Sequence, residues 1–196
     1  MKILVTGGAG LVGSYVVDKL VDSHQVVILD NLEYQKGGIP YLNPKAGFIN
    51  GDITDVKIYE KLKEHNFDIV YHTAAQTSGE ASHEDPKLDI MVNAYGTALV
   101  AKFCKDNNIK QLIYTSTSAM YGSVSDSANE DTPIETRSVY GVSKFAGELF
   151  IKQYLLESDC KYTFFRLCNN YGPGENLNFT KKGMVSIYCN YIWKNK

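Results

Sequence analysis

The chain has 196 residues, of which 44% are hydrophobic and 21% charged, and its formal net charge at pH 7 is -2. This length can bury one full core and add part of a second unit. The nearly balanced charge offers no electrostatic attraction to nucleic acid or to an anionic membrane. No apolar stretch approaches the ~20 residues that cross a bilayer, and the start of the chain has no signal-peptide pattern. We therefore expect a cytoplasmic protein with no nucleic-acid and no membrane partner.

The spacing of cysteine and histidine argues against a metal centre. The chain has four cysteines and four histidines, and none of the cysteines forms a Cys-x-x-Cys pair. The histidines also lack a spacing that would place two ligands on one helical face. We expect buried, reduced thiols and no metal site.

A glycine-rich turn follows the first apolar run, at 2–5, and precedes a helical pattern at 11–22. Glycines at positions 7, 8, 10 and 13 allow backbone angles closed to other residues and bring main-chain N–H groups close to a phosphate. Asp30 ends the next apolar run, where a carboxylate binds ribose hydroxyls and repels a 2′-phosphate. This strand-turn-helix-strand unit predicts a dinucleotide site that prefers NAD over NADP.

Apolar runs and helical patterns alternate along the whole chain. The apolar runs lie at 2–5, 26–29, 46–49, 67–71, 111–115 and 162–167, and the helical patterns lie at 11–22, 55–65, 87–106 and 140–157. This alternation predicts an α/β fold with a doubly wound parallel sheet, whose ligands bind at the carboxyl ends of the strands. Two stretches, 33–44 and 123–138, predict surface loops, and a lid role for the second is an open alternative.

Hydroxyl side chains gather where the fifth apolar run ends, in Thr115-Ser-Thr-Ser118. They either hold a sugar beside the cofactor or cap a turn. Tyr140 and Lys144 are four residues apart in a helical pattern, so both side chains project from one face. A nearby ammonium and a positively charged nicotinamide favour the phenolate of Tyr140, which can take a proton from a substrate hydroxyl bound by Thr117 or Ser116. The order of these features predicts that they converge on one crevice.

Eight motifs together resemble the extended short-chain dehydrogenase/reductase family. They are Thr6-Gly-Gly-Ala-Gly-Leu-Val-Gly13, Asp30-Asn31, Gly51-Asp52-Ile53, His72-Thr-Ala-Ala75, Asn93 in Val-Asn-Ala-Tyr-Gly-Thr97, Thr115-Ser-Thr-Ser-Ala-Met-Tyr-Gly122, Tyr140-Gly-Val-Ser-Lys144 and Arg166-Leu-Cys-Asn-Asn-Tyr-Gly-Pro173. Within that family the chain is most similar to NAD-dependent nucleotide-sugar epimerases and dehydratases. The resemblance implies a Rossmann-like NAD-binding catalytic domain at 1–174 and, at 175–196, the start of a substrate-binding lobe that is largely missing.

The resemblance also implies roles for individual residues. Tyr140 would be the general base and acid, Thr117 would align the substrate, and Lys144 would lower the pKa of the phenol and hold the nicotinamide ribose. The cofactor would contact Gly7, Gly10, Leu11, Val12, Gly13, Asp30, Asn31, Asp52, Ile53, Ala74, Ala75, Gln76, Asn93, Ser116, Tyr140 and Lys144. Among these, Asp52 and Ile53 would lie at the adenine. A nucleotide-diphosphate sugar would contact Ser116, Thr117, Ser118 and Asn169.

The residues after Thr117 separate the activities of the family. Sugar 4,6-dehydratases carry an Asp-Glu pair immediately after the catalytic threonine, whereas this chain has Ser118-Ala119, which disfavours dehydration. A 4-epimerase needs no such pair, because it oxidises C4 of the sugar and returns the hydride to the other face. We therefore expect an NAD-dependent 4-epimerase of a UDP-hexose. A nucleotide-sugar decarboxylase, reductase or dehydratase, or a non-catalytic NAD-binding fragment, is the alternative.

The last residues of the chain predict an amphipathic helix. Its apolar residues are Val185, Ile187, Tyr188, Tyr191, Ile192 and Trp193. Without the rest of the substrate-binding lobe, this apolar face would lack the partner against which it normally packs. Relatives pair through the helices that match 87–106 and 140–157, so the resemblance implies a homodimer joined by a four-helix bundle.

Overall fold

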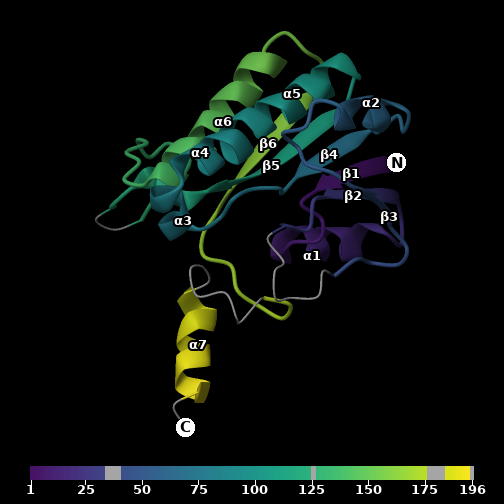
Figure 1. Ribbon diagram of the computed structural model, residues 1–196. Helices are drawn as coiled ribbons and strands as arrows, with labels where there is room; N and C mark the ends of the chain where they lie inside the picture. Colours follow the sequence, from purple (N-terminus) through teal and green to yellow (C-terminus); the bar gives the residue numbers. More distant parts are fainter. Residues whose placement is uncertain (34–40, 125–126, 176–183, 195–196) are drawn as a thin grey trace.

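Six parallel strands form one sheet in the order β3-β2-β1-β4-β5-β6 (Figure 1). The computed structural model describes residues 1–33, 41–124, 127–175 and 184–194. The strands are β1 (Lys2–Thr6), β2 (Gln25–Asp30), β3 (Gly47–Asn50), β4 (Ile69–His72), β5 (Gln111–Thr117) and β6 (Lys161–Leu167). The predicted doubly wound parallel sheet is confirmed. The strand order reverses between β1 and β4, and ligands of such sheets bind in the crevice at this point.

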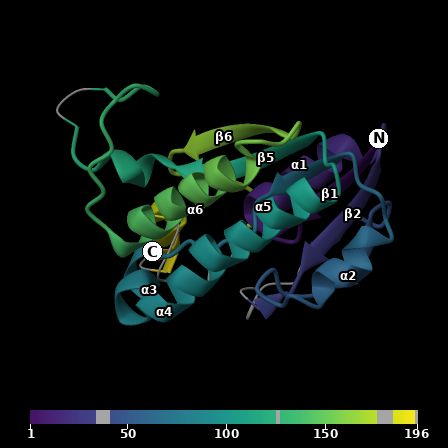
Figure 2. The same cartoon turned by 90° about the horizontal axis from the view of Figure 1, so that it is seen from above.

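Helices cover both faces of the sheet because neighbouring residues of each strand point to opposite sides. On one face, Leu4 packs with residues of α2 (Ile58–Lys63), α5 (Thr97–Asp106) and α6 (Val139–Leu155). On the other face, Ile3 and Val5 pack with Val17 of α1 (Leu11–Leu20). The two layers are visible in Figure 1, and Figure 2 shows α5 and α6 side by side. Burial of each such aliphatic side chain contributes about 2 kcal/mol.

The predicted helix at 87–106 is divided into three segments. It consists of α4 (Pro86–Asp89), the π-helical segment η2 (Ile90–Gly96) and α5. Asp85 caps the start, because its carboxylate accepts a hydrogen bond of 3.1 Å from the Leu88 backbone N–H. The additional helix α3 (Gly79–Glu84) was not predicted, since its six residues are too few and too polar to show a helical period. The π-helical turn widens the backbone at Asn93.

The predicted helix near the end of the chain is present as α7 (Met184–Lys194). It lies apart from the sheet and its covering helices (Figure 1). Its side chains Tyr188, Ile192 and Trp193 are 59%, 63% and 77% exposed. None of the helices within the described ranges is both long and apolar enough to cross a membrane.

Candidate active site

The glycine-rich turn lies at the point where the strand order reverses. Gly7 has a φ of +71°, in the left-handed region that favours glycine. A Cβ atom at Gly7 would lie 2.5 Å from the Ala74 backbone nitrogen, and one at Gly13 would lie 2.1 Å from the Gly7 carbonyl oxygen. The Gly10 N–H donates to that same carbonyl at 3.0 Å. The turn therefore packs too closely for side chains at Gly7 and Gly13.

Helix α1 starts directly after this turn without a side-chain cap. Its first residues, Leu11 and Val12, are half-buried, and the N–H groups of a first helical turn have no partner within their own helix. Uncapped N–H groups and the helix dipole favour an anion at this end. The turn and the helix start thus fit the diphosphate of a dinucleotide.

Two acidic residues lie at the ends of neighbouring strands beside the turn. The Asp30 carboxylate accepts hydrogen bonds from the Ala9 and Leu32 backbone N–H groups at 3.0 and 2.9 Å. Asn31 donates to Asp52 at 2.8 Å. Burial raises the pKa of Asp52, but hydrogen bonds from Thr54 and Asn31 outweigh it and hold that pKa below its usual value. Asp30, predicted to bind the ribose, and Asp52, predicted to lie at the adenine, are therefore at the same edge of the sheet.

The segment after β4 is held against the π-helical segment. The Gln76 N–H donates to Asn93 Oδ1 at 2.9 Å, and Asn93 Nδ2 donates to the Gln76 carbonyl at 3.0 Å. This pair positions the backbone of Ala74 and Ala75 next to the glycine turn. The Gln76 side chain, however, is 2% exposed and donates to Ser82 at 2.9 Å. Because its backbone N–H and carbonyl also bond to Asn93, Gln76 holds this segment against the π-helical segment.

Thr117 ends β5, and Tyr140 lies in the first turn of α6. Both side chains are largely buried, and the Thr117 hydroxyl accepts a hydrogen bond of 3.1 Å from the Ala119 N–H. Burial raises the pKa of Tyr140, the nearby Thr117 hydroxyl opposes this by hydrogen bonding, and the charge of Asp89 adds to it. The net result is a raised pKa. We expected Lys144 to lower the pKa of Tyr140, whereas in the chain without cofactor burial raises it.

Lys144 lies one helical turn after Tyr140 and is 1% exposed. Its ammonium is 4.2 Å from the centre of the Tyr114 ring, a cation–π contact. Burial lowers the pKa of Lys144 to about 7, while the charges of Asp89 and Glu148 act in the opposite direction.

Ser116 supplies an independent sign of a ligand. Its hydroxyl is buried and has no hydrogen-bond partner among the residues that the structure describes. Such a group is costly unless something else binds it. Ser118 follows as the first residue of the short 3₁₀ helix η3 (Ser118–Tyr121) and is half-buried. The unpaired Ser116 hydroxyl fits a site that a cofactor or substrate completes.

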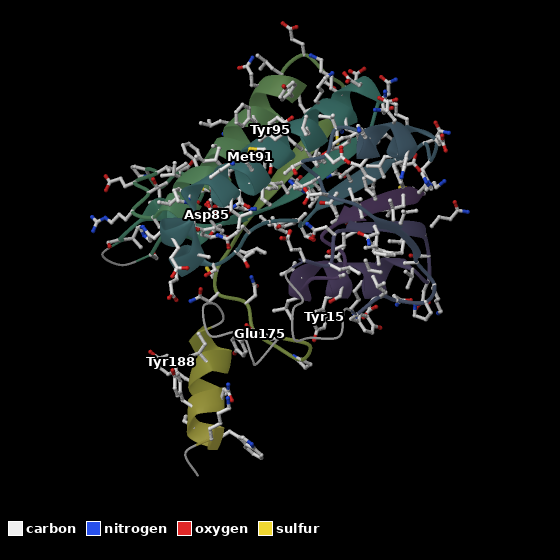
Figure 3. All side chains as sticks on the ribbon, in the orientation of Figure 1. Tyr15, Asp85, Met91, Tyr95, Glu175 and Tyr188 are labelled. Carbon is white, nitrogen blue, oxygen red and sulfur yellow. The ribbon has the colours of Figure 1, made fainter. Side chains whose placement is uncertain are left out.

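Asn169 lies on the segment that leaves β6. Leu167, two residues earlier, pairs with Thr117, so this segment starts beside the hydroxyl cluster. The chain then passes to α1, where the Tyr15 hydroxyl donates to the Pro173 carbonyl at 3.0 Å. Figure 3 shows Tyr15 close to Glu175 on this side of the molecule. The exposed Asn169 is therefore on a segment that crosses from β6 to α1.

The sequence of residues 3–195 matches the NAD dependent epimerase/dehydratase family. This match covers nearly the whole chain, and the order of glycine turn, strand-end carboxylate and Tyr140/Lys144 helix agrees with it. The chain belongs to this family. NAD is the cofactor of the family, so the predicted cofactor is confirmed at this level.

Similar proteins include both epimerases and dehydratases. A putative UDP-glucose 4-epimerase of Methanocaldococcus jannaschii is 36% identical over 99% of this chain and 64% of its own length. A dTDP-D-glucose 4,6-dehydratase of Mus musculus is 34% identical over 88% of this chain and 51% of its own length. This chain thus spans 64% of the length of the first relative and 51% of the length of the second.

Solved structures of epimerases have the same fold. The UDP-glucose 4-epimerase of Thermotoga maritima, determined with UDP-glucose, aligns with a TM-score of 0.92 and 32% identity, covering 100% of this chain and 64% of that one. The UDP-glucose 4-epimerase of Thermus thermophilus, determined with NAD, aligns with a TM-score of 0.91 and 32% identity, covering 100% and 63%. This epimerase/dehydratase chain therefore has the Rossmann-like part of those structures.

Two buried acidic residues of this epimerase/dehydratase chain, Asp89 and Glu148, were not singled out from the sequence. Asp89 is fully buried and accepts hydrogen bonds from Gln76 and Ser82 at 2.5 and 2.7 Å. Glu148 is fully buried and bonded to Arg166. Their signal in the sequence is weak, because a single acid in a helical pattern is usually solvated. Arg166 was quoted in a motif, but its partner lies 18 residues away in another element.

Two of the four cysteines do not follow the expectation of buried thiols. Cys104 and Cys160 are buried, whereas Cys168 and Cys189 are exposed. Cys168 lies just after the last strand and Cys189 lies on α7, where no packed layer covers them. All four are free thiols.

Proposed function

We propose that this chain is the NAD-binding and catalytic part of an enzyme that epimerises a nucleotide-diphosphate sugar at C4, with a UDP-hexose as the substrate. The observation that carries the proposal is the placement of Thr117, Tyr140 and Lys144 at the carboxyl edge of the sheet, next to the glycine turn. The similar epimerases determined with UDP-glucose and with NAD support it. Residues 175–196 would then begin the substrate-binding lobe.

The glycine turn and the strand ends would bind the cofactor. The N-terminal turn of α1 would hold the diphosphate, and Asp30 would accept hydrogen bonds from the adenosine ribose. Asn31, Asp52 and Ile53 would contact the adenine end of the cofactor. NAD, when bound, accepts a hydride from C4 of the sugar and later returns it.

Tyr140 would move the proton that accompanies this oxidation. Its phenol is within hydrogen-bonding reach of Thr117, so both could contact the C4 hydroxyl. Tyr140 would take the proton as the hydroxyl becomes a ketone and would give it back after the sugar has turned over. Because burial raises the phenol's pKa, the phenolate depends on a cation beside it. The Lys144 ammonium, one helical turn away, would supply that charge.

The residues after Thr117 favour epimerisation over dehydration. Elimination of water needs an acid and a base beside the sugar, and this chain has Ser118 and Ala119 in those two places. Ser118 can bind a sugar hydroxyl but is not an acid at neutral pH. Asn169, on the crossing segment, would contact the sugar diphosphate.

Incubation of the chain with NAD and UDP-galactose, followed by product analysis, tests this proposal. Formation of UDP-glucose in wild type and its absence in Tyr140→Phe would support it. A product that has lost water would instead indicate a dehydratase, and loss of carbon dioxide in a parallel incubation with UDP-glucuronic acid would indicate a decarboxylase. Oxidation of added NADH with a 4-keto nucleotide sugar, in place of NAD and UDP-galactose, would indicate a reductase. Binding of NAD without any turnover would contradict catalysis by this chain and favour a non-catalytic NAD-binding unit.

We also propose that two copies pair through the layer formed by α4, η2 and α5, which match the predicted helix at 87–106, and by α6, which matches the one at 140–157. The outer side of this layer carries exposed apolar side chains, and Figure 3 marks two of them, Met91 and Tyr95, each 38% exposed. Val142 and Phe150 of α6 are 54% and 41% exposed. An apolar surface of this kind favours burial against a partner. Light scattering at micromolar concentration should give a dimer for wild type and a monomer for Val142→Glu, and a monomeric wild type would contradict the pairing.

A further inference from the structure

The segment 168–175 that follows β6, here called the crossing segment, passes from one side of the sheet to the other. Leu167, the last residue of β6, pairs with Thr117 at the end of β5. Further along, Pro173 contacts Tyr15 of α1, the helix that follows β1. In the sheet, β4 and β5 lie between β1 and β6. The crossing segment therefore passes the carboxyl ends of β5 and β4 on its way to α1.

The length of the crossing segment allows only a fairly direct path. Neighbouring strands lie about 4.8 Å apart, so β6 and β1 are separated by about 14 Å along the sheet. The chain from Leu167 to Pro173 spans at most about 20 Å when it is fully extended. It must also reach the helix layer below the sheet, which uses up much of the remaining length. Figure 1 shows the segment running from the end of β6 towards α1, past the point where the strand order reverses.

The crossing segment ends in a tight turn at 172–175. The Glu175 N–H donates to the Gly172 carbonyl at 3.2 Å, and Gly174 has a φ of +86°. Proline in the second position and a glycine with positive φ in the third are the pattern of a type II turn. The hydrogen bond of such a turn joins its first and fourth residues, so it does not use the Pro173 carbonyl. That carbonyl can therefore accept a hydrogen bond from another element.

Tyr15 supplies this hydrogen bond from α1. Its hydroxyl donates to the Pro173 carbonyl at 3.0 Å, and a Cβ atom at Gly172 would lie 3.8 Å from the same hydroxyl. Tyr15 lies about one helical turn after Leu11, the first residue of α1. The end of the crossing segment is thus held beside the helix start and the glycine turn, which fit the diphosphate of a dinucleotide. Figure 3 shows Tyr15 and Glu175 on this side of the molecule.

We propose that the Tyr15–Pro173 hydrogen bond holds the crossing segment closed along the α1 side of the cofactor crevice, and that it thereby controls both entry and release of NAD. The bond joins two parts of the protein and does not join the protein to NAD. It therefore resists opening equally before and after the cofactor has bound. Tyr15 is a positioning residue in this role. The inference rests on NAD as the cofactor of the family and is independent of the proposed 4-epimerase reaction.

Tyr15→Phe removes the hydroxyl donor and keeps the ring. Binding of NADH is followed by stopped-flow nicotinamide fluorescence, and its release is followed by displacement with excess NAD. Loss of one net hydrogen bond changes an equilibrium about fivefold, so we expect the association and dissociation rate constants both to rise about fivefold, with Kd nearly unchanged. Unchanged rate constants would overturn the proposal. Faster dissociation alone, with a weaker Kd, would also overturn it, because Tyr15 would then stabilise bound NADH without controlling its entry.

Two further variants test whether the effect belongs to this hydrogen bond. Tyr162→Phe removes a hydroxyl from a 41% exposed ring near the start of β6, at the opposite edge of the sheet, and should keep both wild-type rate constants. Gly174→Ala strains the turn at its positive φ and should displace the Pro173 carbonyl, so it should raise both rate constants. Adding Tyr15→Phe to Gly174→Ala should give no further rise, because both changes break one bond. Additive increases would contradict the proposal.

Chymotrypsin cleavage after Tyr171 measures opening of the crossing segment without any cofactor. Tyr171 is 67% exposed and directly precedes the turn. Because proteolysis follows the population of the open form, Tyr15→Phe should be cut about fivefold faster at this position, and Tyr162→Phe should be cut at the wild-type rate. Equal cleavage of Tyr15→Phe and wild type would overturn the proposal. Neither measurement uses turnover, so its failure is distinguishable from failure of the epimerase assignment.

Discussion

Arg166 on β6 holds the carboxylate of Glu148 on α6 with two hydrogen bonds, of 3.0 and 2.9 Å. The Glu148 side chain is fully buried and that of Arg166 is 16% exposed. Arg166 also donates to the Tyr121 hydroxyl at 2.7 Å. One guanidinium therefore joins β6, α6 and η3.

Removing one partner of this pair should strongly destabilise the fold. Glu148→Gln leaves the Arg166 guanidinium without its counter-charge, and breaking a buried ion pair in this way costs about 3 kcal/mol. Glu60→Gln is the matched control, because Glu60 pairs with Lys63 on the surface, where a pair contributes about 0.5 kcal/mol or less. Urea unfolding of both variants gives the free energies. Equal losses of unfolding free energy in the two variants would show that the buried pair contributes no more to stability than the surface pair.

A side chain at Gly13 should disrupt the cofactor site. The added Cβ of Gly13→Ala would lie 2.1 Å from the Gly7 carbonyl oxygen, which forces the turn to move. We expect the affinity for NAD to fall about tenfold or more, as measured by calorimetric titration. Gly79→Ala is the control, since a Cβ there meets nothing within 4 Å, and it should keep wild-type affinity. Unchanged NAD affinity in Gly13→Ala would show that the NAD diphosphate does not bind at the glycine turn.

Loss of the Tyr140 hydroxyl should abolish the proton transfer while leaving the fold intact. For Tyr140→Phe we expect turnover of UDP-galactose to fall about a hundredfold or more, with NAD still bound. Tyr162→Phe removes a hydroxyl from a 41% exposed side chain of β6 and should keep full turnover. A Tyr140→Phe variant with wild-type kcat would exclude Tyr140 as the base.

His72 should make stability depend on pH. Its pKa is lowered from 6.5 to about 3 in the folded chain, so between these values the unfolded state binds more protons. Stability is therefore fully present above pH 6.5 and is lost as the pH falls, with a slope of at most about 1.4 kcal/mol for each pH unit. Urea unfolding of His72→Gln should show a shallower slope than wild type. The exposed His83→Gln should keep the wild-type slope, and equal slopes for all three would contradict the assignment.

The architecture could be predicted because it follows from local periodicity. Six apolar runs alternate with helical patterns, and the structure has six parallel strands in the expected doubly wound order. The division at Ile90–Gly96 and the helix Gly79–Glu84 could not be predicted, since they depend on Asn93 bonding to the Gln76 backbone and on caps at Ser78 and Asp85. Such hydrogen bonds join separate segments of the chain, so they leave no periodic pattern in the sequence.

By itself, the sequence determined the dinucleotide turn, the parallel sheet and the order of Thr117, Tyr140 and Lys144 along the chain, because glycine spacing and residue period act locally. The tertiary structure alone decided the burial of Lys144, the low pKa of His72, and the pairing of Glu148 with Arg166. Burial and charge compensation arise between elements that are distant in the chain. They therefore exist only after the strands and helices have packed together.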